Sequence, residues 1–485
     1  MQLKRPDLLR QQCYLAGKWC DADSGATAPV SNPATGEVIA HVPLMGAAET
    51  TRAIAAAKTA QKLWAARTAK DRAAVLRKWF DLMMANQEDL AIILTTEMGK
   101  SLTEARGEIA YGASFIEWFA EEGKRVYGET IPQHAADKRI LVLKQPIGVT
   151  AAITPWNFPN AMITRKVGPA LAAGCAQVIK PALETPLSAF ALAVLAEEAG
   201  LPAGLMSVIT GDSRAIGGEM TSNPIVTKLS FTGSTEVGRI LMQQCAPTIK
   251  KLALELGGNA PFIVFDDADL DSAVEGAIIS KFRNSGQTCV CANRLFVQAG
   301  IYDKFAEKLG ARVAAFKVGN GMDDGVNQGP LINEDAVLKV EEHVADVLAN
   351  GGIATMGGKR HALGGTFFMP TVLTGVTAEM KIFREETFGP VAPLIKFKDE
   401  AEVIELANRT EFGLASYFFS RDVGRIFRVA EALEYGMVGV NTGLISTAEA
   451  PFGGVKQSGL GREGSRHGIE DYLEIKYVCL GDINK

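Results

Sequence analysis

The stretch GVTAAITPWNFPNAMITRKVGPALAAGCAQVIKP, residues 148–181, places one predicted helix between two short apolar segments. Residues 148–156 and 175–181 are almost continuously apolar, which is typical of strands buried on both faces of a parallel sheet. Residues 160–174 between them are typical of a helix that ends at a glycine. The alternation continues through a helix at 185–200 and strands at 204–211 and 226–233. This pattern predicts a doubly wound α/β sheet, which binds ligands beyond the carboxyl ends of its strands.

The segments on either side extend this organisation. Residues 45–125 repeat apolar positions every three or four residues without proline, which predicts a set of packed amphipathic helices. A second alternating set begins at residues 260–270 and continues to about residue 443, which predicts another α/β domain. The tail at 471–480 predicts a strand with no evident partner in the chain, which could pair with another subunit.

Composition excludes several classes of function. The 485 residues carry a formal net charge of −5 and show no basic patch, which argues against nucleic acid and membrane-surface partners. No segment reaches the roughly 18 apolar residues of a membrane span, and the first twenty residues lack the apolar run of a signal peptide. Seven irregularly spaced cysteines indicate a reducing compartment, so we expect a cytoplasmic protein. The five histidines are scattered, and we predict no metal site.

The turn SFTGSTEVG, residues 230–238, follows a predicted strand and opens a predicted helix. Gly233 permits a tight turn, and Ser234 can cap the helix and present N–H groups to an anion. The turn matches neither the G-x-G-x-x-G fingerprint nor the Walker A loop. From spacing alone it is either a phosphate cradle or an ordinary capped turn. Lys180 lies at a strand end, where it is either solvated or directed at the same ligand.

Three further positions could carry chemistry. The stretch NSGQTCVCANR, residues 284–294, holds Cys289 and Cys291, which could form a disulfide, half a metal site, a piece of core, or a nucleophile with a neighbour. In an extended strand their Cα atoms would be about 6.6 Å apart, inside the range of a disulfide. Glu255 precedes two glycines and is either a surface carboxylate or a base for a thiol-dependent reaction. Asn157 is either a loop residue or a donor to an oxyanion.

Seven motifs follow one another along the chain: PWNFP, KPA, FTGSTEVG, LELGGNAPFIV, GQTCVCANR, EETFGP and PFGGVKQSGLGREGS. Taken together and in this order, they resemble the NAD(P)-dependent aldehyde dehydrogenase superfamily over nearly the whole chain, and within it the bacterial succinate-semialdehyde dehydrogenases. The resemblance implies two doubly wound α/β domains and a small β oligomerisation element. It implies a Rossmann-like cofactor domain at 1–123 and 147–257, a catalytic domain at 258–457, and the oligomerisation element at 124–146 and 458–485.

The resemblance also implies roles for individual residues. Cys289 is the nucleophile that forms a thiohemiacetal and then a thioester, Asn157 holds the oxyanion, and Glu255 activates the hydrolytic water. Cys291 is its neighbour, and we hypothesise that a reversible Cys289–Cys291 disulfide protects or regulates the enzyme. The implied cofactor residues are Trp156, Lys180, Gly233, Ser234, Glu386 and Phe388, and the implied ligands of a substrate carboxylate are Arg165, Arg283 and Ser446.

The implied reaction is oxidation of succinate semialdehyde to succinate, as in 4-aminobutyrate degradation. Glutarate semialdehyde or a broader range of aldehydes is the alternative, because one methylene discriminates only about 10–200-fold. Family members that prefer NAD commonly carry a glutamate where this chain has Leu183, so the sequence favours NADP, with NAD still usable. The resemblance also implies a homodimer or homotetramer. The rival hypotheses are a silent member of the fold and a thiol hydrolase that needs no nicotinamide.

Overall fold

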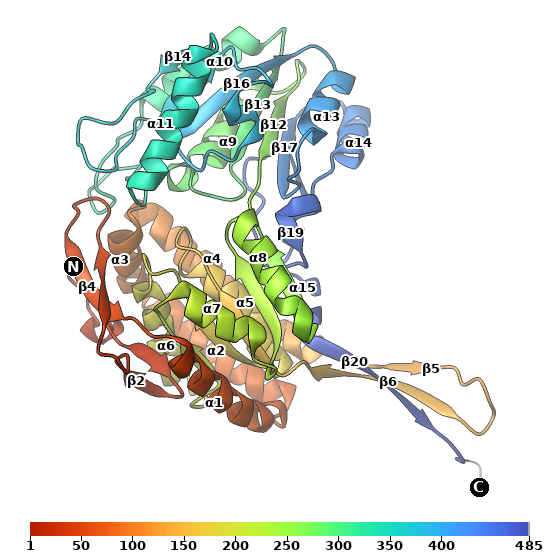
Figure 1. Cartoon of the computed structure of the whole chain (residues 1–485). Coiled ribbons are helices and arrows are strands. Elements are labelled where there is room, and N and C mark those ends of the chain that lie inside the picture. The colour runs from red at the N-terminus through yellow and green to blue at the C-terminus, as the bar shows by residue number, and fades with distance from the viewer. Residues whose placement is uncertain (484–485) are drawn as a thin grey trace.

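The computed structural model describes residues 1–483, and its first sheet confirms the predicted strand–helix alternation (Figure 1). The strand order is β19-β11-β10-β7-β8-β9-β1-β2, with the five strands from β11 to β9 parallel and the outer strands antiparallel. The strands are β1 (Cys13–Leu15), β2 (Lys18–Cys20), β7 (Val149–Ile153), β8 (Ala176–Lys180), β9 (Met206–Val208), β10 (Val226–Thr232), β11 (Lys251–Glu255) and β19 (Gly459–Leu460).

The order of these strands creates a switch point in the first sheet. The chain passes from β7 through β8 to β9 in one direction, and then from β10 to β11 in the other. Strands β7 and β10 are therefore neighbours, although 72 residues separate the end of one from the start of the other. Their carboxyl ends open on the loops at 154–160 and 233–234, where such a sheet binds its ligand.

Helices cover both faces of this sheet around one large apolar core. Helices α5 and α6 pack between the sheet and the layer formed by α2, α3 and α4, while α1 and α7 cover the other face. The set of packed helices expected between residues 45 and 125 is thus confirmed, and it consists of α1 to α4. The helices are α1 (Ala47–Ala65), α2 (Ala69–Ala85), α3 (Gln87–Met98), α4 (Leu102–Glu122), α5 (Ala161–Ala173), α6 (Leu187–Glu198), α7 (Ser213–Ser222) and α8 (Thr235–Cys245).

The second half of the chain forms another sheet, with the order β14-β15-β16-β13-β12-β17-β18, in which only β14 is antiparallel. Its strands are β12 (Ala260–Val264), β13 (Ala292–Gln298), β14 (Ile353–Met356), β15 (Thr371–Thr374), β16 (Val391–Phe397), β17 (Ala415–Phe419) and β18 (Met437–Val440). Its helices are α9 (Leu270–Phe282), α10 (Tyr302–Ala314), α11 (Glu334–Ala349), α12 (Lys381–Arg384), α13 (Glu400–Asn408) and α14 (Val423–Ala432), and α15 (His467–Glu470) follows near the C-terminus.

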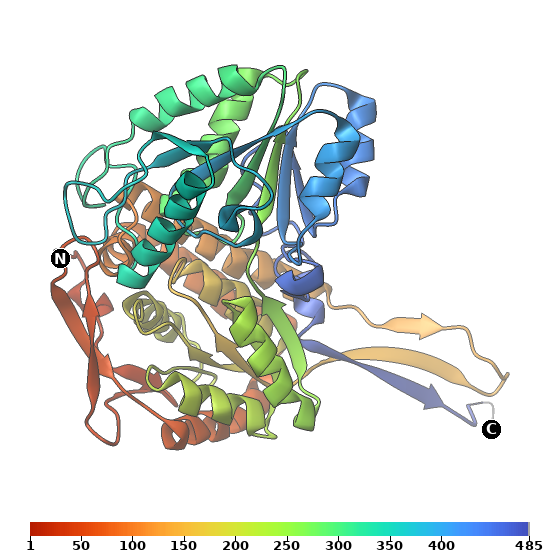
Figure 2. The same ribbon diagram turned by 45° about the horizontal axis from the view of Figure 1, so that its top comes forward.

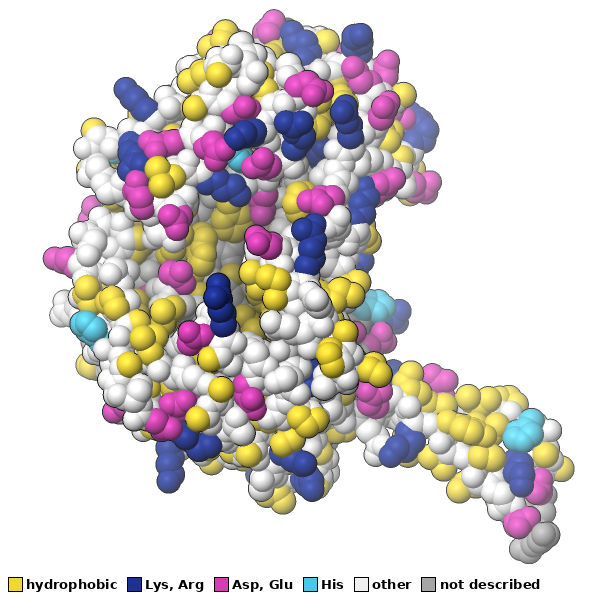
Figure 3. All heavy atoms as spheres, in the orientation of Figure 1, with side chains coloured by type: hydrophobic (Ala, Val, Ile, Leu, Met, Phe, Trp, Pro, Cys, Tyr) yellow, Lys and Arg dark blue, Asp and Glu magenta, His cyan; other side chains and the backbone are white. Residues whose placement is uncertain are grey.

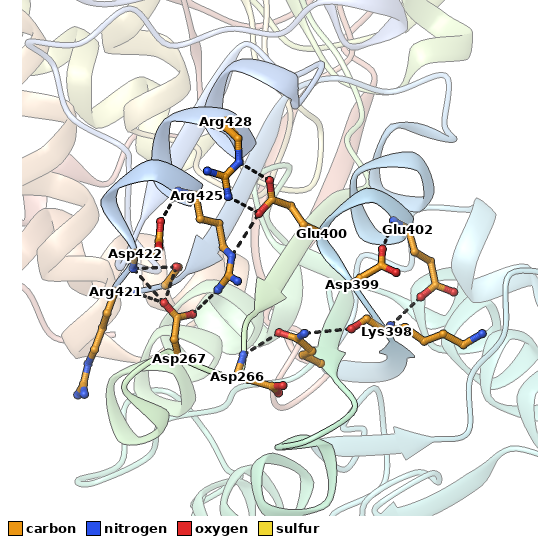
Figure 4. Close-up of polar contacts among 12 residues, drawn as sticks. Asp266, Asp267, Lys398, Asp399, Glu400, Glu402, Arg421, Asp422, Arg425 and Arg428 are labelled. Atoms are coloured by element: carbon orange, nitrogen blue, oxygen red, sulfur yellow. Dashed lines mark hydrogen bonds and ion pairs between the residues drawn. The ribbon is translucent and has the colours of Figure 1, made fainter.

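The carboxyl ends of β12 and β17 in this second sheet are closed by a network of ion pairs and hydrogen bonds (Figure 4). Arg425 Nη1 lies 2.7 Å from Asp267 Oδ1, and Arg425 Nε lies 3.3 Å from Glu400 Oε2. Arg428 adds a contact to Glu400 at 2.8 Å. The Asp267 carboxylate also accepts backbone N–H groups from Arg421 and Asp422, both at 2.9 Å. The carboxyl ends of these strands are therefore held together by ion pairs and hydrogen bonds. The residues of the second sheet that face the ligand come from the opposite, amino ends of its strands.

A three-stranded antiparallel sheet forms an arm that projects from the body (Figures 1 and 2). It contains β5 (Glu129–Ile131), β6 (Arg139–Pro146) and β20 (Leu473–Leu480) in the order β20-β6-β5. Strand β20 pairs with β6 along its full length, so the expectation that the terminal strand lacks a partner within the chain is wrong. The hairpin had no obvious signal because its strands are half-exposed and far apart in sequence from β20. Ile475 is 73% exposed and Tyr477 59%, which leaves apolar surface on the arm.

Two other observations complete the fold. A separate hairpin, β3 (Thr27–Ser31) with β4 (Val38–Pro43), lies near the N-terminus (Figure 1). Among residues 1–483, no helix is both long enough and apolar enough to cross a membrane.

Candidate active site

The cleft between the two halves contains a cavity of about 350 Å³ at the switch point of the first sheet. The molecular surface in Figure 3 is hollowed between the two halves, with apolar side chains inside the hollow. The first half contributes residues that follow β7, β10 and β11, whereas the second half contributes residues that precede β13 and β16. The lining residues are Pro155, Trp156, Asn157, Thr232, Gly233, Ser234, Leu256, Gly257, Cys289, Asp335, Ala336, Lys339, Glu386, Thr387 and Phe388.

Cys289 reaches this cavity from a turn that follows an unusual backbone segment. Asn284, Ser285 and Gly286 all have positive φ, at 52°, 55° and 76°, which is rare outside glycine. A Cβ at Gly286 would lie 2.1 Å from the carbonyl oxygen of Gly389, so only glycine fits there. The segment reverses the chain after α9 and presents the Cys289 side chain to the cleft.

Cys291 faces a different environment. Residues 288–291 form a turn in which the Cys291 N–H donates to the Thr288 carbonyl at 2.9 Å, and β13 begins only at Ala292. The extended geometry assumed from the sequence for Cys289 and Cys291 is therefore wrong. The Cys291 side chain is buried, and its sulfur lies 3.6 Å from the Lys281 carbonyl. All seven cysteines, which lie within the described part of the chain, are free thiols.

The surroundings of Cys289 favour the neutral thiol. Burial raises its pKa to about 12, the Arg165 guanidinium acts in the opposite direction, and the carboxylates of Glu386 and Glu255 reinforce the rise. A raised pKa means that the thiolate fraction grows with pH throughout the neutral and alkaline range.

We therefore expect alkylation of Cys289 by iodoacetamide, without cofactor, to accelerate about tenfold per pH unit from neutral pH upward, without levelling off below about pH 10. Quantifying the modified Cys289 peptide by mass spectrometry gives the rate separately from that of the exposed Cys479. A rate that reached its plateau near neutral pH would show that the resting enzyme already holds a thiolate.

Asn157 lies beside the Cys289 loop, as the predicted oxyanion donor must. Its side-chain nitrogen Nδ2 donates to the Gln287 carbonyl at 3.1 Å, which uses one of the two N–H groups of the amide. Its oxygen Oδ1 is buried and has no hydrogen-bond partner among the described residues. The second N–H group is thus available for a substrate atom next to Cys289.

Glu255 ends β11, is buried, and is not among the residues that line the cavity. Burial raises the pKa of this carboxyl well above its usual range, and the nearby Glu463 carboxylate adds to the rise. Arg165 and Lys166 oppose it. Its oxygen Oε2 has no hydrogen-bond partner within residues 1–483. A buried carboxyl whose pKa is raised and whose Oε2 has no hydrogen-bond partner is a candidate for proton exchange with a bound water.

Lys166 and Glu463 belong to this site and were not predicted from the sequence. Glu463 pairs with Lys166, and its Oε2 lies 2.6 Å from Arg165 Nε. Lys166 also donates to Thr232 at 2.7 Å. Lys166 is a fully buried charge in the apolar helix α5, and Glu463 lies within the last of the quoted motifs. The signal that could have identified this pair in the sequence was Lys166, a charged residue inside a helix predicted to be buried, because a buried charge requires a buried partner.

The expected cofactor residues line the same cavity, with one exception. The rings of Trp156 and Phe388 meet edge to face, with centroids 5.6 Å apart, and Phe388 has a positive φ of 53°. Glu386 accepts the Gly258 N–H at 3.1 Å, and burial raises its pKa to about 7. Gly233 and Ser234 form the turn before α8, where Ser234 Oγ accepts the N–H of Val237.

Lys180 is the exception, because it lies at the end of β8 and does not line the cavity. It is 5% exposed, and its Nζ lies 3.5 Å from the Pro181 carbonyl. Burial lowers its pKa, while Glu184 and Asp212 act in the opposite direction. Lys339 and Asp335 also line the cavity, from α11, and were not predicted from the sequence. Their helix lies far along the chain from every quoted motif.

A second cavity, of about 260 Å³, lies next to the Cys289 loop and contains two of the three expected carboxylate ligands. Arg283 lies over the ring of Phe158, 4.9 Å from its centre, and no carboxylate of the described residues pairs with it. The other lining side chains are mainly apolar, or are polar groups that already bond to other residues of the protein. The lining residues are Lys100, Glu104, Gly107, Glu108, Tyr111, Phe158, Ile279, Arg283, Asn284, Leu444 and Ser446.

Arg165, the third expected ligand, is not at this cavity's surface. It is 1% exposed, pairs with Glu463, and lies over the ring of Phe452 at 3.9 Å. Its Nη2 is buried with no hydrogen-bond partner in the described residues. The structure thus brings Arg283 and Ser446 together and places Arg165 beside Glu255 and Glu463. Residues 1–483 contain no cluster of three or more His, Cys, Asp or Glu side chains that could hold a metal ion.

Comparison with known proteins agrees with this geometry. Residues 19–478 match the aldehyde dehydrogenase family. The chain is 67% identical to a glutarate-semialdehyde dehydrogenase of Pseudomonas aeruginosa, over 100% of both chains. It is 65% identical to a succinate-semialdehyde dehydrogenase [NADP(+)] of Escherichia coli, over 99% of this chain and 100% of the relative. A solved succinate-semialdehyde dehydrogenase from Burkholderia pseudomallei superimposes with a TM-score of 0.99 at 67% identity, covering 99% of this chain and 100% of that one. The chain belongs to the aldehyde dehydrogenase family.

Proposed function

We propose that the protein oxidises succinate semialdehyde to succinate with NADP, and with NAD less efficiently. The choice of substrate is supported by the Arg283 guanidinium. This group has no carboxylate partner among the described residues and shares an otherwise mostly apolar cavity with Ser446. A short aldehyde that ends in a carboxylate would pair with Arg283 while its aldehyde carbon reaches Cys289. Arg165 is buried and does not line this cavity, so the proposed carboxylate contacts are those of Arg283 and Ser446.

The proposed chemistry follows from the residues around the first cavity. The Cys289 thiol gives its proton to solvent water, and its sulfur attacks the aldehyde carbon to form a thiohemiacetal. The oxyanion accepts the free N–H of Asn157 and the backbone N–H of Cys289. Loss of hydride from that carbon leaves a thioester. Glu255 then takes a proton from water, whose oxygen adds to the thioester carbon, and the acid leaves as the Cys289 thiol is restored.

The first cavity fits a nicotinamide dinucleotide, which when bound would accept that hydride. A side chain at Gly257 would lie 3.0 Å from Glu386 Oε2 and 3.5 Å from Thr235 Oγ1, so glycine keeps open the space between the carboxylate and the start of α8. Glu386 and Lys180 would hold riboses, Gly233 and Ser234 the diphosphate, and Trp156 and Phe388 would pack near the nicotinamide. Leu183 in place of an acidic residue removes repulsion against a 2′-phosphate, which Lys180 could pair with.

The test is a panel of aldehydes with both cofactors, followed by the absorbance of the reduced nicotinamide. Succinate semialdehyde with NADP should give the highest kcat/KM, with glutarate semialdehyde within about 10–200-fold. A panel that produced no reduced nicotinamide would contradict the dehydrogenase function. A kcat/KM for NAD about tenfold above that for NADP would show that our interpretation of Leu183 is wrong.

Replacing Arg283 with methionine is expected to raise the KM for succinate semialdehyde about 10–100-fold, because a charged hydrogen bond of about 1.5–3 kcal/mol is lost. The KM for hexanal, which has no carboxylate, should change little. Arg312→Met is a matched control, since Arg312 lies near the same loop but pairs with Glu275. An equal effect of Arg283→Met on both aldehydes would mean that Arg283 supports the fold rather than binding the substrate.

Three further proposals accompany this function. The sparse cysteines support a cytoplasmic location, and the exposed apolar side chains of the arm support assembly into a homodimer or homotetramer. A role in 4-aminobutyrate degradation would follow from the substrate. A reversible Cys289–Cys291 disulfide stays a prediction, and it would require rearrangement of the 288–291 turn, because Cys291 faces the Lys281 carbonyl.

A further inference from the structure

Three charged residues between α3 and the first turns of α4 lie behind the catalytic loops. Lys100, Glu104 and Glu108 all contribute to the wall of the 260 Å³ cavity, and none has a role in the chemistry described above. Their polar atoms are directed away from the cavity, toward the loop that carries Asn157 and the loop that carries Cys289.

Lys100 is a buried cation whose bonding capacity is completely used. Its Nζ donates to Glu108 Oε2 at 2.6 Å and to the Asn157 carbonyl at 2.8 Å, and it lies 3.7 Å from the centre of the Phe158 ring. An ammonium group has three N–H bonds, and these are three acceptors: a carboxylate, a carbonyl and an aromatic face. Lys100 therefore fixes the backbone of Asn157 itself.

Glu108 fixes the other end of the same turn. Its Oε1 accepts the backbone N–H groups of Asn160 at 3.0 Å and Ala161 at 3.3 Å, at the start of α5. The Lys100–Glu108 pair thus holds the Asn157–Asn160 turn at both ends.

Glu104 connects this turn to the Cys289 loop. Its Oε1 accepts the backbone N–H of Asn284 at 2.7 Å, at the first of the three positive-φ residues. The Asn284 side chain in turn donates to the Asn157 carbonyl at 3.0 Å. The two loops that supply the oxyanion donors are therefore both held by hydrogen bonds to one short segment, the α3–α4 junction.

We propose that Lys100, Glu104 and Glu108 are positioning residues that set the spacing between the Asn157 amide and the Cys289 N–H for the thiohemiacetal oxyanion. This inference rests on the proposed covalent route. A buried ion pair can often be replaced by apolar packing without loss of stability, so stability alone does not require it. Misplacement of a catalytic group by about 1 Å can cost about 100-fold in rate.

The test is a double-mutant cycle on the first turnover, measured as the rapid burst of reduced nicotinamide. The variant Lys100→Met/Glu108→Gln removes the pair without leaving a lone buried charge. We expect its burst rate to fall about 10–100-fold, while cofactor affinity measured by fluorescence titration stays within about twofold. In an Asn157→Ala background the same pair of substitutions should add less than about a threefold loss, because its effect passes through Asn157. A full additional loss in that background would overturn the proposal.

Two controls separate positioning from general stability. Glu97 is a buried carboxylate that accepts N–H groups at the start of α6 and makes no contact with Asn157, so Glu97→Gln should lower the melting temperature and leave the burst rate unchanged. A comparable slowing by Glu97→Gln would contradict the proposal. If the double variant does not fold, the partly exposed Glu104 gives the same test: Glu104→Ala should slow the burst, and Glu104→Gln, which keeps an acceptor oxygen, should restore it.

The burst is measured with whichever aldehyde of the panel the wild type oxidises fastest, so an error in the proposed substrate leaves the test intact. A wild type that shows no burst, with label from the aldehyde never retained on Cys289, would instead contradict the covalent route.

Discussion

Replacing Cys289 with alanine is expected to lower kcat for aldehyde oxidation by about 10⁴-fold or more, because no other thiol of residues 1–483 lines the cavity. Cofactor affinity should stay close to that of the wild type, since the thiol contributes little binding surface. The measurement is production of reduced nicotinamide at high enzyme concentration, alongside a titration of the cofactor.

Cys291→Ala is the matched control for this substitution. The Cys291 thiol is buried against the Lys281 carbonyl and does not line the cavity, so its loss should leave turnover within a few fold of the wild type. Full activity of the Cys289→Ala variant would exclude the thiohemiacetal at Cys289. Loss of activity in Cys291→Ala alone would show that Cys291, and not Cys289, is the nucleophile.

Replacing Glu255 with glutamine should separate the two halves of the reaction. Glutamine fills the same space and cannot accept a proton, so hydrolysis of the thioester should slow about 10²–10⁴-fold. The first turnover should still release about one reduced nicotinamide per active site, after which the acyl-enzyme accumulates. Stopped-flow absorbance measures the burst and the later steady rate in one trace, and mass spectrometry of quenched enzyme detects the acyl group.

The pH dependence gives this prediction a second readout. A raised pKa means that Glu255 is ionised, and able to act as a base, only toward higher pH. The wild-type deacylation rate should therefore keep rising with pH above the usual titration range of a carboxyl group, and the Glu255→Gln variant should lose that rise. A variant in which burst and steady rates fell by the same factor would show that Glu255 acts before the thioester forms.

The sequence predicted the first half of the fold well because its signals are local. The strands at 149–153, 176–180 and 226–232 and the helices α5 and α6 are buried on both sides, so their composition alone identifies them. The pairing of β6 with β20 depends on contacts between residues more than 300 positions apart, which leave no local pattern. The same reason explains the wrong expectation for the terminal strand.

The candidate site shows the same limit. The rule that ligands lie beyond carboxyl ends led to Asn157, Gly233 and Ser234, which follow β7 and β10. The second sheet presents its amino ends to the cleft, so Cys289 and Phe388 came from the motifs and not from that rule. Lys166, Glu463 and the Lys100–Glu108 pair were missed because a buried charge is recognised only when its partner is found, and each partner is supplied by tertiary structure.

Two helices of the first half have N-terminal N–H groups that already bond to side chains of the protein. This affects where the dinucleotide would bind. In a standard Rossmann fold the diphosphate rests on the first helix after the first strand. Here the corresponding N–H groups of α5 already bond to Glu108, and those of α6 bond to Glu97. An internal carboxylate stands in for the phosphate at both positions. The first βα turn is thereby released from holding the diphosphate, and the proposed function uses its Asn157 amide to stabilise the reacting oxygen.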